Sequence, residues 1–385
     1  MAGFSRNNSI KLLHAGREFF ELLEKLIADA RHSIHLHTYI FGNDETGNMV
    51  AHQLSEAAGR GVKIYMLVDG YASSSLPSNF IKSLTDAGIE FRFFKPLFKS
   101  RTLYFGRRLH HKVIVVDGIN ALVGGINIAD RYNDTPDEPA WLDLAVYVYG
   151  DAAKELYTLC CRLWTRRRSR RFALPDTLPP KAAYIETRNN CQVRVRRNDW
   201  VKRKQEIFKT YLEIFRSSKK NITILCSYFM PGTSFRKALE RAARRGVCIR
   251  VVLTGQSDVP ISKYAERYLY RWMLRNKIQI YEYKPCVVHA KMAIADEQLL
   301  TIGSFNINNI SAYASIELNL DINEPAFSKQ VHEELEGIIS KECDVIDSNT
   351  YKTKLYSFRQ LFQWGAFQCI RFMLTVSTFY FRQKE

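Results

Sequence analysis

The chain repeats its own sequence, and this duplication limits its fold more than any other feature. EAAGRGVKIYMLVDG at 56–70 returns as RAARRGVCIRVVLTG at 241–255. In both copies a basic residue and a glycine end a helical pattern before a β-branched run typical of a buried parallel strand. Helix and strand patterns alternate in the same order over roughly 10–155 and 200–340. Because self-similarity at this scale marks a repeated structural unit, we expect two related lobes.

This alternation of helix and strand predicts an α/β fold. We expect two pseudo-symmetric lobes, each a mixed, mostly parallel sheet flanked by helices, with the active site at their interface. A basic run and then prolines mark a seam between the halves. The predicted division is an N-terminal lobe at 1–161, a linker at 162–199, a C-terminal lobe at 200–346 and a basic, aromatic tail at 347–385.

Two stretches, 110–127 and 289–306, carry the same polar residues at the same spacing. In each, Lys follows His by two positions, Asp follows Lys by five, Gly follows Asp by seven and Asn follows Gly by three. These residues are His110, Lys112, Asp117, Gly124, Gly125 and Asn127 in the first stretch, and His289, Lys291, Asp296, Gly303, Ser304 and Asn306 in the second. Residues two apart share one face of a strand, so the His and Lys of each stretch project together.

The paired residues suit chemistry on a phosphate ester. One imidazole can attack phosphorus while the other protonates the departing alcohol. Two lysines and two asparagines, Lys112, Lys291, Asn127 and Asn306, can hold the non-bridging oxygens as negative charge develops. No other cluster of His, Cys, Asp and Glu has metal-ligand spacing, so we expect neither a metal nor another cofactor.

Two copies of His-x-Lys-x4-Asp-x6-Gly-Gly/Ser-x-Asn inside a duplicated chain resemble the phospholipase D superfamily, whose members carry two HKD motifs. GGINIADRY after the first motif and GSFNINNISAYASIELNL after the second resemble bacterial cardiolipin synthases, over about residues 10–345. The similarity is to the short form without N-terminal membrane helices. It implies one active site shared by the lobes, a phosphatidyl-histidine intermediate, and transfer to a phosphatidylglycerol hydroxyl that yields cardiolipin.

The same resemblance assigns roles within the motifs. It implies that His110 is the nucleophile and His289 the general acid and then base, although the pseudo-symmetry permits the reverse. Asp143 in AWLDLAV and Glu317 in ASIELNL stand at matching places downstream of the motifs and would orient the histidines. His111 aligns with Ala290 and should point to the opposite strand face, so we expect it to be dispensable for the chemistry.

The remaining motif residues have less direct roles. Asp117 and Asp296 belong to the catalytic motif, but we expect each to fix a turn or to pair with a lysine. The candidate phosphate contacts are Asn127, Asn306, Ser304 and Gly125. Three positions depart from the family pattern. Gly125 replaces the commoner Ser, His37 replaces Glu, and Ser315 replaces Asn. The last two changes bear on headgroup recognition and leave the phosphate chemistry intact.

The net charge of the chain narrows the classes of molecule that it is expected to bind. A formal charge of +17 and a pI of about 9.5 favour polyanions, which are nucleic acids or anionic membrane surfaces. Basic and aromatic residues interleave in the insert at 97–109, and the tail at 361–381 is apolar and aromatic. Both favour anionic phospholipid, namely phosphatidylglycerol and cardiolipin, over nucleic acid. The duplicated chain supplies both half-sites, so catalysis requires no homodimer.

The tail allows three interpretations: a helix packed on the C-terminal lobe, an interfacial anchor, or, least favoured, a membrane span. Eight scattered cysteines without a CxxC pair favour a reducing compartment. The N-terminus lacks the apolar core of a secretory signal. With the resemblance, these features predict a peripheral or interfacially anchored protein on the cytoplasmic side of the bacterial inner membrane.

Other functions remain open at the level of sequence. If water resolves the intermediate, the protein is a hydrolytic phospholipase D that releases phosphatidic acid. The positive charge would also serve a phospholipase D-like nuclease, although the insert and the tail favour lipid. A non-catalytic lipid-binding protein fits less well, because both motifs are intact.

Overall fold

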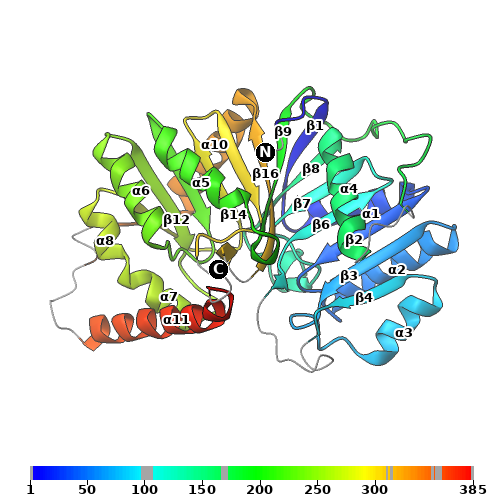
Figure 1. Ribbon diagram of the computed structural model, residues 1–385, viewed down its shortest axis with the longest axis horizontal. Coiled ribbons are helices and arrows are strands. Elements are labelled where there is room, and N and C mark those ends of the chain that lie inside the picture. The colour runs from blue at the N-terminus through cyan, green and yellow to red at the C-terminus, as the bar shows by residue number, and fades with distance from the viewer. Residues whose placement is uncertain are drawn as a thin grey trace.

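The computed structural model of the protein shows two α/β lobes side by side (Figure 1). It describes residues 3–96, 107–165, 172–308, 311–312, 315–347, 351 and 358–382, and the side chains of the last segment from 360 to 372. Each lobe has one twisted sheet with helices against it. The predicted architecture of two α/β lobes with mixed sheets is confirmed.

The N-terminal lobe is built on a seven-stranded sheet in the order β1-β8-β7-β6-β2-β3-β4. Its strands are β1 (Asn8–His14), β2 (Ser33–Thr38), β3 (Lys63–Asp69), β4 (Glu90–Phe94), β6 (Lys112–Val116), β7 (Asn120–Gly124) and β8 (Leu144–Gly150). Its helices are α1 (Arg17–Asp29), α2 (Glu45–Gly59), α3 (Ser78–Asp86) and α4 (Asp151–Trp164), with a 3-10 turn η1 (Asp130–Tyr132). The apolar positions of α1 that keep helical spacing face the sheet and are buried, as the pattern predicts.

The C-terminal lobe repeats this plan in the order β10-β9-β16-β15-β14-β11-β12-β13-β17. Its strands are β9 (Gln192–Asp199), β10 (Lys204–Gln205), β11 (Asn221–Cys226), β12 (Cys248–Thr254), β13 (Gln279–Tyr283), β14 (Lys291–Ala295), β15 (Leu299–Gly303), β16 (Ser315–Asn323) and β17 (Cys343–Ile346). Its helices are α5 (Glu206–Ser217), α6 (Thr233–Arg244), α7 (Pro260–Tyr268), α8 (Tyr270–Arg275), α10 (Pro325–Glu342) and α11 (Phe358–Arg382), and η2 (Trp200–Lys202) follows β9.

The prediction of mostly parallel sheets is wrong. In the first sheet only the pairs β2–β3 and β3–β4 are parallel, and the other neighbours are antiparallel. Helix–strand alternation accounts for the parallel part, where helices cross over between strands. After β4 the alternation stops, because β6 and β7 form a hairpin and β8 returns beside them. The motif residues therefore lie in the antiparallel half of each lobe.

The predicted linker at 162–199 also differs from the structure. Its last eight residues form β9, which pairs with β16 along its full length. Just before β9, Arg188 exchanges backbone hydrogen bonds with Ile10 of β1. The alternation of apolar and charged residues in β9 has the strand period, but the basic and Pro-rich run before it hides this signal. The connecting segment is therefore part of both sheets at its C-terminal end.

The two lobes share one hydrophobic core. Residues of β6, β7 and β8 pack in the same buried cluster as residues of β14, β15 and β16, together with α4 and α10. Separate clusters lie under α1 and α2 in the first lobe and under α5, α6 and α7 in the second. Because the shared cluster includes the motif strands, the positions of the two motifs relative to each other are fixed by close packing.

Candidate active site

Each motif histidine lies where the chain touches the sheet of the other lobe. The short strand β5 (Arg108–Leu109) runs parallel to β16 of the C-terminal lobe, with Leu109 opposite Ile316. His110 N then donates to Ile316 O at 3.1 Å. In the second half, Leu142 of the N-terminal lobe bridges to Val288, and His289 N donates to Leu142 O at 2.8 Å. The pseudo-symmetry of the lobes thus extends to the two places where the chain of one lobe pairs with the other lobe.

These crossings pair each histidine with an acid from the opposite lobe. His110 Nδ1 lies 2.9 Å from Glu317 Oε2, and His289 Nδ1 lies 2.6 Å from Asp143 Oδ2. Both carboxylates are buried. With Nδ1–H donating to a carboxylate, each imidazole keeps its Nε2 for chemistry. Sequence analysis named these two acids, and the structure places both against the histidines, in a crossed arrangement.

Burial controls the charge of the site. Burial lowers the pKa of His110, although Glu317 opposes this, and it lowers the pKa of His289 to about 3. Burial alone would raise the pKa of Asp143, but His289 and Lys291 outweigh it and the pKa is lowered. At neutral pH the two imidazoles are therefore uncharged and Asp143 is ionised, which is the state a nucleophile or general base requires.

The two motif lysines converge on the same region. Lys112 Nζ donates to His110 O at 2.6 Å and lies 5.2 Å from the centre of the Tyr39 ring. Lys291 Nζ donates to Ser227 Oγ at 3.0 Å and also to His289 O. Burial, and next to it the charge of Lys291, lower the pKa of Lys112 to about 7. The two cations are thus close enough to repel each other, and a bound anion would relieve that repulsion.

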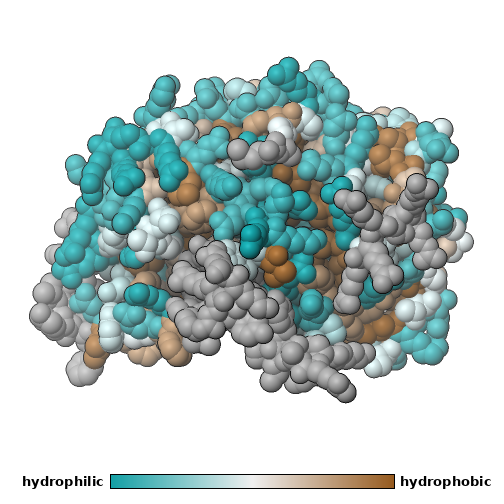
Figure 2. Space-filling model, in the orientation of Figure 1, coloured by the Kyte–Doolittle hydropathy of each residue, from teal (hydrophilic) through white to brown (hydrophobic). Residues whose placement is uncertain are grey.

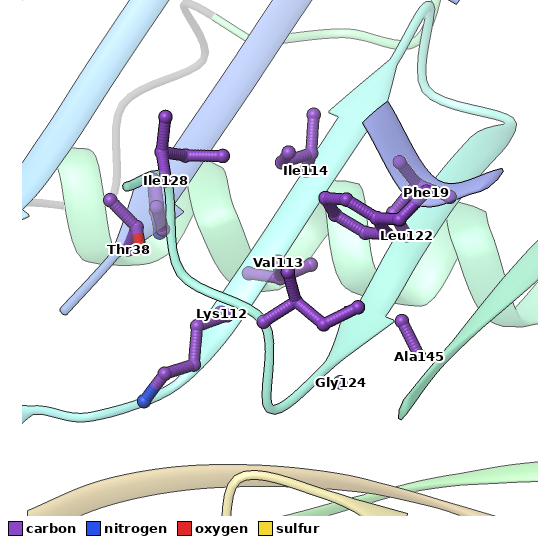
Figure 3. A pocket seen from close by; sticks show the side chains of 11 residues that line it. Phe19, Thr38, Lys112, Val113, Ile114, Leu122, Gly124, Ile128 and Ala145 are labelled. Atoms are coloured by element: carbon purple, nitrogen blue, oxygen red, sulfur yellow. The ribbon is translucent and has the colours of Figure 1, made fainter. Parts of the chain in front are cut away.

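Behind Lys112 the sheet is apolar. Figure 3 shows Lys112 at the start of β6, with its Nζ turned away from Phe19 and Leu122. The cavity drawn there has a volume of about 10 Å³, enough for about one water molecule. This cavity belongs to the interior beneath the site and is too small for a substrate. The lysine is therefore held by apolar packing with its charge directed toward the other lobe.

Comparisons with known proteins agree with this geometry. A family model described as cardiolipin synthase, PLD-like domain, matches residues 23–156 and again residues 211–339. Cardiolipin synthase B of Escherichia coli (strain K12) is 32% identical over 352 residues, which covers 88% of this chain and 82% of the relative. The chain belongs to the phospholipase D superfamily.

Further relatives support this membership of the phospholipase D superfamily. Cardiolipin synthase of Geobacillus sp. (strain WCH70) is 30% identical over 355 residues, 91% of this chain and 69% of that protein. The crystal structure of phosphatidylserine synthase from Haemophilus influenzae Rd KW20 matches with a TM-score of 0.74, over 98% of this chain and 96% of the other, at 15% identity. The last comparison shows a shared two-lobed fold.

The asparagines of the superfamily motif stand at the turns after β7 and β15. Asn127 is buried, and its Oδ1 accepts from Ile40 N at 3.0 Å, which fixes the orientation of its amide. Asn306 is buried as well, and its backbone N donates to Ser311 Oγ at 3.2 Å. Each asparagine is thus held by its own lobe, with its side chain within the same buried region as the motif lysine.

Ser304 and Gly125, the paired positions before the asparagines, contact the orienting acids. Ser304 Oγ donates to Glu317 Oε2 at 2.5 Å. A Cβ at Gly125 would lie 2.2 Å from Asp143 Oδ1, so the Asp143 carboxylate occupies the space that a side chain would need. The departure from Ser at this position thus has a physical reason in this chain, because the glycine admits the carboxylate that holds His289.

The motif aspartates do not belong to the reacting group. Asp117 lies beyond the C-terminal end of β6, whereas His110 precedes its first residue. Its carboxylate accepts from the backbone N of Arg31, His32 and Ser33, at 2.7 to 2.9 Å. Asp296 does the same for the backbone N of Lys219, Lys220 and Asn221. Their inclusion among catalytic residues is corrected: both tie the loop before a parallel strand to the motif hairpin.

Replacing Asp117 by Ala should therefore lower stability without removing catalysis. The substitution leaves three backbone N–H groups without their acceptor, and we expect a loss of about 2–4 kcal/mol in the free energy of unfolding. Denaturant unfolding of the purified variant measures this loss. Turnover per folded molecule should remain within about threefold of the parent, because the carboxylate does not touch the reacting atoms. A variant of parental stability that has lost turnover would contradict this assignment.

Three aromatic residues around the histidines were not singled out from the sequence. Tyr132 OH lies 3.4 Å from His289 Nε2, and the rings of Tyr132 and Trp141 flank that imidazole. Tyr39 meets His110 edge-on, with 4.8 Å between ring centres. Tyr132 closes the stretch GGINIADRY, so its distance from the motif was a usable signal. Tyr39 and Trp141 belong to neither motif, and only the folded chain brings them there.

His111 is fully buried and points away from the site, as its position on the strand predicts. Its Nε2 lies 3.4 Å from His37 Nδ1, and the two rings stack. Burial lowers the pKa of His111 to about 3, so it packs as a neutral group. His37, the residue that departs from the family pattern, is thus an interior neighbour of His111, and Ser315 is buried on β16 beside Arg108.

The insert predicted to contact lipid lies mostly outside the described residues, since 97–106 are not among them. Its last two arginines are held by acids: Arg107 forms a bidentate pair with Asp199, and Arg108 lies 3.6 Å from Asp69. Within the described part of the chain, no group of three or more His, Cys, Asp and Glu side chains is arranged to hold a metal ion.

Proposed function

We propose that this member of the phospholipase D superfamily is a phosphatidyltransferase that makes cardiolipin from two molecules of phosphatidylglycerol. The observation that carries the proposal is the pair of neutral histidines, each oriented by a buried acid of the other lobe. Its relatives of about 30% identity, matched over most of the chain, are named cardiolipin synthases. Their name suggests the lipid substrate, and the site supplies the groups for the transfer.

In the first step, His110 Nε2 attacks the phosphorus of the donor lipid. The nitrogen–phosphorus bond forms as the bond to the headgroup glycerol breaks, and His289 Nε2–H gives its proton to the departing oxygen. Lys112 and Lys291, with Asn127 and Asn306, hold the non-bridging oxygens. In the second step, His289 takes the proton of an acceptor phosphatidylglycerol hydroxyl, whose oxygen attacks phosphorus. His110 leaves, and the products are cardiolipin and glycerol.

Binding of the substrate itself promotes the protonation of His289 that the first step requires. A general acid must carry a proton, yet burial holds the pKa of His289 at about 3 in the free protein. A phosphodiester brings a negative charge next to His289 and both lysines, and an anion at this distance raises the pKa of each of these groups. His289 can therefore bind its proton together with the lipid, which links activation of the general acid to substrate binding.

Two features favour His110 as the nucleophile. Its side chain is 16% exposed against 9% for His289, so it is the more accessible imidazole to an incoming lipid phosphate. His289 is enclosed by Tyr132 and Trp141, and an enclosed group is suited to keeping a proton away from water between the two steps.

We place the enzyme peripherally on the cytoplasmic face of the bacterial inner membrane, with anionic phospholipid as its partner. All eight cysteines are unpaired, which suits a reducing compartment. Among the described residues, no helix is both long and apolar enough to cross a membrane.

Labelled lipid distinguishes transfer from hydrolysis. The full-length protein is incubated in mixed micelles with phosphatidylglycerol carrying one label in an acyl chain and another in the headgroup glycerol. We expect cardiolipin and free glycerol in equal amounts. Phosphatidic acid without cardiolipin would show that water resolves the intermediate. Inert lipid together with cleavage of added nucleic acid would replace the proposal by a nuclease.

A further inference from the structure

The C-terminal helix α11 packs along α7 with one face. Gln363, Ala366 and Ile370 are buried against the C-terminal lobe and recur at helical spacing. The ring of Phe362 meets Tyr264 edge-on, and Phe367 packs against Tyr268. The helix thus lies along the surface of the C-terminal lobe (Figure 1). The prediction of a tail helix packed on the domain is confirmed for this face.

The opposite face of α11 also carries large apolar side chains, beside Gln368 and Arg371, and no described residue covers them. Leu361, Trp364 and Phe372 are 63%, 46% and 69% exposed. At about 100° per residue they fall on one stripe, roughly opposite the stripe that contacts α7. Within the part of the chain that the structure describes, protein covers only the stripe of α11 that faces the C-terminal lobe.

The exposed apolar residues of the protein gather at this place. Eleven large hydrophobic side chains are exposed in the described part of the chain, and seven of them lie on α7, on α11 or just before α7. These seven are Val259, Ile261, Tyr264, Leu361, Phe362, Trp364 and Phe372. Figure 2 shows apolar side chains along this lower edge of the lobe, whereas the upper part around α6 is hydrophilic. Patches of this kind mark interaction sites.

The charge of this region is strongly positive. Helices α7, α8 and α11 contain seven Lys and Arg residues (Lys263, Arg267, Arg271, Arg275, Arg359, Arg371 and Arg382) and one acid, Glu266. Glu266 is buried and paired with Lys263 at 2.8 Å. Lys263 is buried and Arg267 pairs with Glu282 of β13 at 2.9 Å, so the exposed cations described here are Arg275 and Arg371. Aromatic rings beside exposed cations suit the headgroup zone of an anionic bilayer, because the rings enter the interface while the cations meet lipid phosphates.

The same surface borders the active site. Asp258 precedes the exposed Val259, which is the residue before α7, and it accepts from Tyr228 OH at 2.6 Å. Tyr228 directly follows Ser227, whose Oγ accepts from Lys291 Nζ at 3.0 Å, so this contact lies next to the second motif. Glu266 of α7 accepts from Phe229 N at 3.2 Å, which ties the helix to the loop carrying Tyr228. The orientation of α7 is thus coupled to the C-terminal side of the site.

We propose that the exposed face of α7 and α11 is the surface by which the enzyme docks on an anionic bilayer. In this position α11 lies in the headgroup layer, and the beginning of α7 brings the rim of the active site to the membrane. The proposal rests on the proposed function for the choice of a lipid partner over a second copy of the chain, since a lipid substrate must reach the site from the bilayer.

Vesicle binding tests this docking without requiring turnover. The double variant Leu361→Ser/Trp364→Ser and the single variant Phe372→Glu remove exposed groups, and Tyr184→Ser serves as matched control. Tyr184 is 49% exposed and its OH donates to Asp29 at the C-terminal end of α1, before β2, whereas His110 lies at the other end of the strands β2 and β6. We expect each α11 variant to bind vesicles of phosphatidylglycerol and phosphatidylcholine about tenfold or more weakly than the parent. The control should bind like the parent.

Two further measurements separate the possible failures. Activity on phosphatidylglycerol dispersed in detergent should be unchanged in the α11 variants, which shows an intact fold and site. Loss of vesicle binding supports docking even if the lipid product proves to be phosphatidic acid, so failure of the proposed transfer is distinguishable. Unchanged vesicle binding in folded α11 variants would overturn docking. A second result would also overturn docking: the parent protein forms a dimer without lipid, the α11 variants are monomeric, and their vesicle binding persists. The exposed face would then be covered by a second copy of the chain.

Discussion

Alanine at His110 or at His289 is expected to reduce cardiolipin formation by about 10³-fold or more, because each position supplies a bond-forming or proton-transferring atom. Turnover of labelled phosphatidylglycerol by the purified variants measures the loss. His111→Ala is the matched control, since its imidazole is adjacent in sequence but packs against His37. That variant should melt earlier and yet keep its turnover per folded molecule.

The two histidine variants should also differ from each other. With His289→Ala, the first step loses its acid, but a donor lipid carrying a p-nitrophenyl headgroup needs no proton on the leaving group. We therefore expect this donor to release nitrophenolate and to leave the phosphatidyl group on His110, found by mass spectrometry of the quenched protein. His110→Ala should release none. The opposite pattern would exchange the two roles, and full turnover by either variant would refute the two-histidine mechanism.

Neutralising the crossed acids is expected to cost about 10²–10⁴-fold in turnover, because an amide in place of the carboxylate no longer holds the tautomer with Nε2 available or stabilises the imidazolium. The changes are Asp143→Asn and Glu317→Gln, with Asp137→Asn as an exposed control. The crossed geometry makes a further prediction. With the p-nitrophenyl donor, Asp143→Asn should regain the first step, measured as release of nitrophenolate, because Asp143 serves His289, whereas Glu317→Gln should not.

Rescue of Glu317→Gln alone would show that each acid serves the histidine of its own lobe or that the histidine roles are reversed. Labelling the trapped intermediate in the same variant separates these two outcomes, because it identifies the histidine that carries the phosphatidyl group. Parental turnover in both acid variants would remove the acids from the mechanism altogether.

The sequence predicted which residues form the candidate site better than it predicted how these residues are arranged. The matched motifs named His110, Lys112, His289 and Lys291, and the resemblance to the phospholipase D superfamily named the two acids downstream of the motifs. The crossing of the acids could not be read in this way, because the spacing within each half is the same whichever lobe supplies the carboxylate. It depends on how β5 pairs with β16, and a two-residue strand leaves no periodic signal.

The differences between the sequence predictions and the structure have similar causes. Helix–strand alternation fits β2, β3 and β4, but a hairpin of buried strands such as β6 and β7 shows the same β-branched runs as a parallel sheet. The spacing groups the motif aspartates with His and Lys in one motif, although we expected each to fix a turn or to pair with a lysine. A distance of five residues along an extended strand, however, is about 16 Å, which separates Asp117 from Lys112 by the whole length of β6.

The crossing of His110 to Glu317 determines when activity appears during synthesis of the chain. Their side chains meet across 207 positions, and the partner of the first histidine lies on β16, near the end of the second lobe. A nascent chain therefore exposes an imidazole on the ribosome long before the acid that orients it has been made. No truncated product, and no released N-terminal half, contains a complete site. The proposed active site is therefore complete only after translation has passed β16 and both lobes have packed against each other.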